Sequence, residues 1–287
     1  MQLPAPVGDA VHALLRELDR AVPGLVEGLY LTGSVAMGDF RTGRGPARWA
    51  PSGATRSDVD FVAVVTAHPD DDAVEALRAV HRGLTAGPGS GGRPPVEGVY
   101  LTRADLAGDP ADATGLVHVH GGRTGRDGAG QPVLWQEMAQ LAVAVRGPHR
   151  DELAVRADRD QLTGWLRGNL DGYWRRWHAA CSRRLSPAGA LGLTHWPPVW
   201  GVLGVARIQH TLDTGLVCSK SAGARYALQT FDRRWHRILD ECLRLRTGAG
   251  RPRYANPVAR RRDALDLVAE VIAAGTAGPG PGSRPAP

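Results

Sequence analysis

Two aspartates, Asp58 and Asp60, are the residues whose type and spacing most directly suggest chemistry. They open the segment Ser-Asp-Val-Asp-Phe-Val-Ala-Val-Val, whose apolar run is typical of a buried β-strand. Residues i and i+2 of a strand point to the same face, about 6–7 Å apart, so the two carboxylates project together. They repel each other unless a cation lies between them, and Mg²⁺ favours carboxylate oxygens together with substrate phosphates. The spacing therefore predicts a Mg²⁺ site.

A Gly-Ser pair upstream suggests a place for the phosphates. Residues 27–32 read as a strand, Gly33 and Ser34 follow it, and residues 35–40 can form a short helix. Small residues at such a turn let phosphate oxygens approach backbone N–H groups at a helix N-terminus. We expect Gly33, Ser34 and Ser57 to bind and orient the phosphates of a nucleotide. The alternative is a strand end with two solvated aspartates near a loop.

Glu97 supplies a third carboxylate on another predicted strand, residues 96–101. A glutamate among apolar strand residues is costly unless it is paired or binds a ligand. Glu97 could complete the metal site, or accept the proton of an attacking hydroxyl. The alternative places it in water at the edge of the sheet. His118 and His120 share one side of a possible strand and could line a cleft, but packing is their default role and metal ligation is not expected.

The hydrophobic pattern predicts two domains of different character. Residues 1–157 read as an α/β domain with a small mixed sheet and helices, with helices at 9–21, 70–85 and 134–141 and strands at 27–32, 59–65, 96–101 and 142–146. Residues 42–55 read as a surface insertion, and 104–132 as irregular and glycine-rich. Residues 158–274 read as an all-helical bundle, with helices at 158–181, 198–214, 219–231, 233–246 and 257–274. We expect a disordered tail at 275–287 and a cleft between the domains.

The composition limits the cellular locations and the kinds of site that we expect. The formal net charge of +6 is carried almost wholly by arginine, because Lys220 is the only lysine in the chain. A single lysine in such an arginine-rich chain is a candidate phosphate ligand, although one lysine could also remain by chance. No apolar stretch is long enough to span a membrane, no signal peptide is apparent, and Cys181, Cys218 and Cys242 lack disulfide or zinc spacing. We expect a cytoplasmic protein.

These motifs resemble a known family. Leu31 to Ser34 together with Ser57 to Asp60 resemble the signature of the DNA polymerase β-like nucleotidyltransferase superfamily. The helical half sharpens the likeness to the aminoglycoside adenylyltransferases that modify streptomycin and spectinomycin. Residues 141–148, the segment from Val205 to Lys220, and Tyr254 carry it further. The segment between Ser34 and Asp58 is longer here than in the family.

The resemblance implies a Mg²⁺-dependent in-line transfer of AMP from ATP to a substrate hydroxyl. It implies that Asp58, Asp60 and Glu97 form the catalytic and metal-binding set, with Glu97 accepting the proton. It further implies that Lys220 contacts the triphosphate and that Tyr254 lies near the nucleotide. Arg207 is a second expected phosphate contact, although an ordinary surface role on its helix fits the sequence nearly as well.

The acceptor is less well defined. Residues 185–206 contain no Asp, Glu, Lys or Arg, whereas a polycationic aminoglycoside needs acidic contacts. Trp196 and Trp200 could stack on a sugar ring, but such residues more often form core. We expect ATP and a small molecule as partners of a monomer, most simply an aminoglycoside or aminocyclitol antibiotic, with no membrane and no nucleic acid. The alternatives are another hydroxylated metabolite, an RNA or protein acceptor, and a non-catalytic nucleotide-binding homologue.

Overall fold

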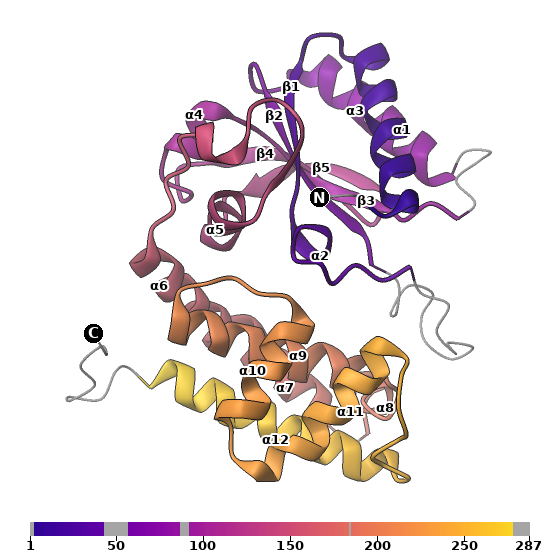
Figure 1. Ribbon diagram of the computed structural model, residues 1–287, viewed down its shortest axis with the longest axis vertical. Coiled ribbons are helices and arrows are strands. Elements are labelled where there is room, and N and C mark those ends of the chain that lie inside the picture. The colour runs from indigo at the N-terminus through magenta and orange to yellow at the C-terminus, as the bar shows by residue number, and fades with distance from the viewer. Residues whose placement is uncertain (1–2, 43–56, 87–91, 184, 278–287) are drawn as a thin grey trace. The chain divides into compact units, whose positions relative to one another are not determined.

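The computed structural model describes residues 3–42, 57–86, 92–183 and 185–277 (Figure 1). Contacts between residues divide the chain into an N-terminal unit that ends at Asp158 and a C-terminal unit that begins at Arg159. The predicted insertion at 42–55, apart from Thr42, and the predicted tail beyond residue 277 lie outside the described residues.

The N-terminal unit is built on a six-stranded sheet of strand order β5-β4-β3-β2-β1-β6. The strands are β1 Val26–Leu31, β2 Val59–Val65, β3 Val96–Thr102, β4 Thr114–His120, β5 Arg123–Ala129 and β6 Val143–Arg146. Only β2 and β3 pair in parallel, and the remaining neighbours are antiparallel. The parallel pair is joined by the helix α3, as a crossover requires. The predicted mixed sheet is confirmed.

Helices cover both faces of this sheet (Figure 1). Helices α1 (Ala5–Ala21) and α3 (Asp71–Ala86) pack on one face, where Leu14, Leu18 and Leu77 are fully buried against Leu29, Leu31 and Phe61. The other face carries Trp135 and Met138 of α5 (Pro132–Gln140) against Val62 and Val64. Side chains alternate along a strand, so even-numbered residues of β2 face α5. This alternation decides where the aspartates point.

The prediction that residues 104–132 are irregular was wrong. They contain most of the helix α4 (Arg103–Ala107) and the antiparallel hairpin of β4 and β5. The strand β5 reads Arg-Thr-Gly-Arg-Asp-Gly-Ala and has no alternating apolar pattern, because neither of its faces is buried in the core. It is held by pairing with β4, a tertiary interaction that local sequence does not reveal.

The C-terminal unit is helical. Its helices are α6 Arg159–Asn169, α7 Arg175–Ser182, α8 Pro187–Leu191, α9 Trp196–Thr214, α10 Lys220–Thr230, α11 His236–Thr247 and α12 Pro257–Thr276. The single helix expected at 158–181 is divided by a π-helical turn at Leu170–Trp174. The short helix α8 was not predicted, and α12 ends two residues later than expected. None of the described helices is long and apolar enough to cross a membrane.

The long helix α9 forms the centre of the helical unit. Its Gly201 and Gly204 make room for the large rings of Trp177 and Trp174, since a Cβ on either glycine would lie 2.5 Å or 2.3 Å from a ring carbon. Most residues from Gly201 to Ile208 are buried. Tryptophans from the preceding helices therefore pack directly onto the backbone of α9.

Candidate active site

Gly33 and Asp60 are in direct contact at one end of the sheet. Gly33 follows β1 as the first residue of the short helix α2 (Gly33–Ala36), which begins earlier than the helix expected at 35–40. Its φ of +55° is a left-handed conformation that favours glycine. A Cβ at this position would lie only 2.0 Å from Asp60 Oδ2. The Asp60 carboxylate therefore lies directly over the α-carbon of Gly33, and the Gly-Ser turn and the aspartate pair belong to one site.

Strand register brings the other predicted carboxylates to the same place. Asp58 and Asp60 precede Val62 in the same alternation, so they lie on the sheet face that α5 covers. Glu97 is the parallel partner of Asp60 across β2 and β3. Asp60 and Glu97 therefore lie on one face of two neighbouring strands, and Asp58 directly precedes β2 on the same side.

The electrostatics of Asp60 reflect this clustering. Its pKa is raised to about 7, first because the carboxyl is buried and then because Asp58, Glu137 and Glu97 are negatively charged neighbours. A hydrogen bond from the backbone of Ser34 acts in the opposite direction. A raised carboxyl pKa at a strand end marks a position where a cation would be favoured.

The Glu97 carboxylate makes two hydrogen bonds, to His120 and to Gly121. Its Oε2 lies 2.6 Å from Nδ1 of His120, and its Oε1 accepts the backbone N–H of Gly121 at 2.8 Å. His120 extends the register in which Val99 faces His118, so it lies directly opposite Glu97 on β4. His120 is thus a candidate site residue whose role the sequence did not reveal, although its place on the strand was visible.

Glu137 is a second residue that sequence reasoning missed. It lies on α5, and its Oε2 accepts the backbone N–H of Gly33 at 3.3 Å. Among the charges that raise the pKa of Asp60, Glu137 ranks after Asp58 and before Glu97. No sequence motif indicated a role for Glu137. It is 104 positions from Gly33 in the chain, and only the fold brings α5 close to Gly33.

The two serines differ in their partners. The Ser34 hydroxyl is buried and has no hydrogen-bond partner among the described residues. The Ser57 hydroxyl instead accepts the backbone N–H of Arg41 at 3.1 Å. A buried hydroxyl without a hydrogen-bond partner is energetically costly. Of the two serines, Ser34 is therefore the better candidate to bind an oxygen atom of a ligand.

The donor set fits Mg²⁺ bound together with a nucleotide. Among the described residues, no three His, Cys, Asp or Glu side chains form a ready-made metal cage. Mg²⁺ does not need one, since it is commonly held by one or two carboxylates together with phosphate oxygens and water. Asp58 and Asp60 would supply the two carboxylates, and Ser34 a neutral oxygen beside them.

The helical unit holds the remaining predicted residues. Lys220 is the first residue of α10, and its Nζ lies 4.6 Å from the centre of the Trp200 ring on α9. Arg207 also lies on α9, where its backbone packs against Gly223 of α10. These two basic residues therefore lie on two closely packed helices.

Tyr254 lies in a different environment. It is only 7% exposed, its hydroxyl donates to Asp263 at 2.7 Å, and the Arg237 guanidinium stacks 4.1 Å from its ring centre. Burial comes first among the causes that raise its pKa, followed by the hydrogen bond to Asp263. These contacts give Tyr254 a structural place within the helical unit.

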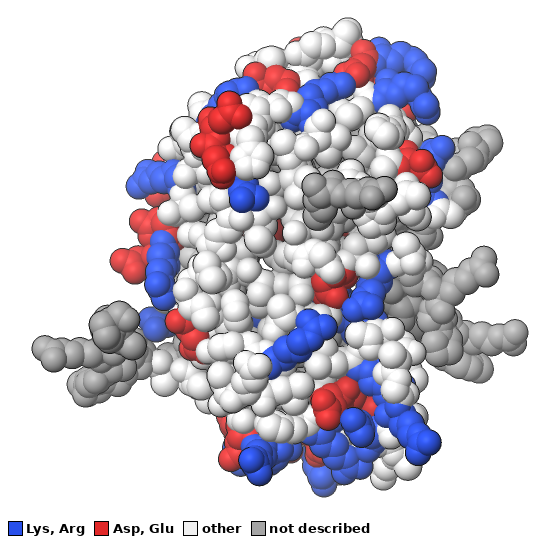
Figure 2. All heavy atoms as spheres, viewed as in Figure 1, with Lys and Arg blue, Asp and Glu red and all other residues white. Residues whose placement is uncertain are grey.

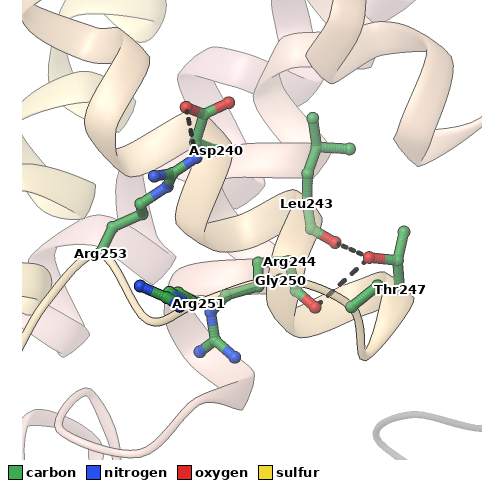
Figure 3. A pocket seen from close by; sticks show the side chains of 8 residues that line it. Asp240, Leu243, Arg244, Thr247, Gly250, Arg251 and Arg253 are labelled. Carbon is green, nitrogen blue, oxygen red and sulfur yellow. Dashed lines mark hydrogen bonds and ion pairs between the residues drawn. The ribbon is translucent and has the colours of Figure 1, made fainter.

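A shallow pocket of about 210 Å³ on the helical unit contains none of the predicted site residues (Figure 3). It is lined by Asp240, Leu243, Arg244, Thr247, Ala249, Gly250, Arg251 and Arg253. Two of its arginines are already paired, Arg244 with Glu241 at 2.8 Å and Arg253 with Asp240 at 3.6 Å. Much of the positive charge in this pocket is therefore neutralised by acidic residues of the protein itself.

Comparison with known proteins finds a family match within the helical unit. Residues 187–271 match the family model described as the C-terminal domain of aminoglycoside adenylyltransferase. No curated protein sequence matches the chain at a significant level. Among solved structures, spectinomycin adenyltransferase AAD(9) from Enterococcus faecialis, crystallised with ATP and spectinomycin, has a TM-score of 0.59 and 12% identity. The match covers 91% of this chain and 99% of that one.

At 12% identity the structural likeness shows a shared fold. The family match adds a sequence likeness that is limited to residues 187–271. Together they show that the chain resembles an aminoglycoside adenylyltransferase in its fold and, over residues 187–271, in its sequence.

Proposed function

We propose that this enzyme transfers AMP from ATP to a hydroxyl of an aminoglycoside or aminocyclitol antibiotic, and that the transfer depends on Mg²⁺. The observation that carries the proposal is the contact of Asp60 with the Gly33-Ser34 turn, beside Asp58 and Glu97. This places paired carboxylates next to a buried hydroxyl that lacks a partner among the described residues. Nucleotidyl transfer needs a cation and phosphate oxygens at such a point.

In the proposed reaction each residue has a defined task. Asp58 and Asp60 would hold Mg²⁺, and the bound ion would supply positive charge beside the phosphates of ATP. Ser34 and the backbone of the turn orient these phosphates. Glu97 accepts the proton of the acceptor hydroxyl as its oxygen attacks the α-phosphorus and pyrophosphate leaves. Lys220, with Arg207, stabilises the negative charge of the pyrophosphate.

For the acceptor we favour a compact aminocyclitol over a highly charged aminoglycoside. The segment 185–206 carries no acidic residue, so it offers little to balance several positive charges. Spectinomycin, the compound in the crystals of the solved neighbour, is the first acceptor to test. Exposed aromatic surface on Trp196 and Tyr173 suits the apolar faces of a ring system.

An RNA acceptor has weaker support. Several of the arginine pairs that could bind phosphate are occupied within the protein: Arg175 pairs with Asp171, Arg234 with Glu270, and Arg262 with Asp263. On the face drawn in Figure 2, acidic side chains lie among the basic ones. A nucleic-acid surface would instead present an uninterrupted basic stripe.

The direct test is an assay of the full chain with ATP, Mg²⁺ and a panel of spectinomycin, streptomycin and neutral polyols. We expect pyrophosphate release and an acceptor whose mass rises by one AMP, with spectinomycin as the best substrate. Asp58→Asn and Asp60→Asn should each lower turnover at least ~10²-fold, as the loss of other preorganised electrostatic groups does. Near-normal turnover in either variant would contradict the assignment, as would transfer without a divalent cation.

A further inference from the structure

The ammonium group of Lys220 lies over the face of an indole ring. Its Nζ is 4.6 Å from the centre of the Trp200 ring, within the range of a cation–π interaction. Lysine has four rotatable side-chain bonds, so each contact of its ammonium group reduces the number of positions that the group can occupy. The indole face therefore restricts where the positive charge can lie.

Trp200 is itself held on several sides. Its Nε1–H donates to the hydroxyl of Tyr173 at 3.0 Å. The Trp196 ring stacks on it with centroids 5.6 Å apart and an interplanar angle of 16°, and the buried Trp174 ring lies 6.3 Å away. An indole with its N–H bonded and two rings packed around it has a fixed orientation. The ammonium group of Lys220 therefore contacts a ring whose own position is fixed.

The backbones of the two helices are also brought close together. A Cβ on Gly223 of α10 would lie 2.7 Å from the α-carbon of Arg207 on α9, so only glycine allows this approach. At the start of α10, the Ser219 side chain accepts the backbone N–H of Ala222 at 3.1 Å and caps the helix. Lys220 follows this cap directly, so its α-carbon is as well positioned as its ammonium group.

We propose that Trp200 is a positioning residue that holds the ammonium group of Lys220 ready for the triphosphate of ATP. The proposal rests on the proposed function in one respect, namely that Lys220 contacts the phosphates. Trp200 does not touch the nucleotide in this scheme. It acts through Lys220 by reducing the conformations that the lysine must give up when the phosphates arrive.

The expected size of the effect follows from the contact. A cation–π interaction at a partly exposed site corresponds to a change of about 2- to 5-fold in an equilibrium constant. We therefore expect Trp200→Leu to weaken ATP binding by about this factor. Trp200→Phe keeps an aromatic face and should give a smaller loss.

The chain itself offers a direct readout, because Lys220 is its only lysine. Reductive methylation with ¹³C-formaldehyde labels only Lys220 and the terminal amine, so the NMR spectrum of the full chain contains two assignable methyl signals. Methyl groups above an indole face are shifted upfield by its ring current. We expect an upfield Lys220 signal in the wild type without nucleotide and a normal position in Trp200→Leu.

A matched control is available in Trp235→Leu. Trp235 carries the Arg234 guanidinium over its ring at 4.7 Å, so the control removes a cation–π contact of the same kind from the same unit. It should leave the Lys220 signal where it is. An unshifted Lys220 signal in the wild type overturns the proposal even if Trp200→Leu does not fold.

A double-mutant cycle on ATP affinity, measured by calorimetry with Mg²⁺, tests the link to the nucleotide. If Trp200 acts through Lys220, Trp200→Leu should weaken ATP binding in the wild type and have no further effect in the Lys220→Ala background. Equal losses in both backgrounds overturn the positioning role. Lys220→Ala with unchanged ATP affinity refutes the phosphate contact in the proposed function, while an upfield methyl signal would still establish the Trp200 contact.

Discussion

The Asp60 carboxylate lies against the α-carbon of Gly33, and this contact joins two motifs that are 27 residues apart in the chain. Gly33 contributes a left-handed backbone conformation directly after β1, and Asp60 contributes a partly buried acid on β2. The turn has no room for any side chain at Gly33. The glycine is therefore required for the position of a carboxylate as well as for the backbone.

Gly33→Ala should lower adenylyl transfer by about 10²-fold, because a displacement of a reacting group by ~1 Å has an effect of that size. Gly38→Ala is the matched control. Gly38 also has a positive φ, +64°, but a Cβ there meets nothing within 4 Å. Both variants carry the strain of alanine in a left-handed conformation, and only Gly33→Ala displaces Asp60. Equal turnover of the two variants would argue against this view.

Mg²⁺ should stabilise the protein more at alkaline than at acidic pH. The pKa of Asp60 is raised to about 7, so between roughly pH 4 and 7 the folded state retains a proton that the unfolded state releases. The contribution of Asp60 to the free energy of unfolding therefore falls as the pH rises through this window. A bound cation offsets the repulsion once Asp60 is ionised.

Thermal unfolding with and without Mg²⁺, at about pH 5.5 and about pH 8, measures this effect. The rise in Tm should be larger at the higher pH, and Asp60→Asn should remove most of the difference. The difference between wild type and Asp60→Asn isolates this group from the other titrating residues. A Mg²⁺ effect that is independent of pH in the wild type would speak against Asp60 as a ligand.

Glu137→Gln tests the carboxylate that α5 contributes. The change keeps the acceptor for the Gly33 N–H but removes a negative charge beside Asp60. The pKa of Asp60 should fall, so the acidic limb of the pH–rate profile should move to lower pH. The apparent affinity for Mg²⁺ should also weaken, by several-fold, because the site loses charge. Glu152→Gln, which removes an acid from a short 3₁₀ helix, serves as the control.

Glu97→Gln should lower kcat by about 10²- to 10⁴-fold, the range expected for loss of a general base. His120→Ala should have a smaller effect in the same direction, because it frees one oxygen of Glu97 and leaves the Gly121 hydrogen bond in place. Steady-state kinetics with saturating ATP separates kcat from KM. A His120→Ala variant that changes only KM would show that His120 does not act through Glu97.

Glycines in the helical unit should respond in opposite directions to alanine. Gly204→Ala on α9 places a Cβ 2.3 Å from the Trp174 ring and should destabilise the protein by about 1–3 kcal/mol through overpacking. Gly164→Ala on α6 meets nothing within 4 Å and should stabilise it by about 0.5–1 kcal/mol. Urea denaturation of both variants measures the two changes.

Local sequence was informative where a segment is strongly patterned. Residues 59–65 were predicted as a strand and form β2 with the same bounds, because the apolar run at 61–65 is too short for a typical helix and is typical of a buried strand. The same alternation placed Asp58 and Asp60 together. A possible strand was noted at His118 and His120, but its hairpin with β5 was missed, because β5 is polar and glycine-rich and is held by its partner strand.

The sequence by itself determined the chemical types in the site and their local spacing, since Gly33-Ser34 and Asp58-x-Asp60 depend only on one turn and one strand. The tertiary structure alone decided which distant groups join them. Glu137 reaches Gly33 because α5 packs on one face of the sheet, and Lys220 lies over Trp200 because Gly223 lets α10 approach α9. Such contacts depend on packing between elements, which short-range propensity and periodicity do not encode.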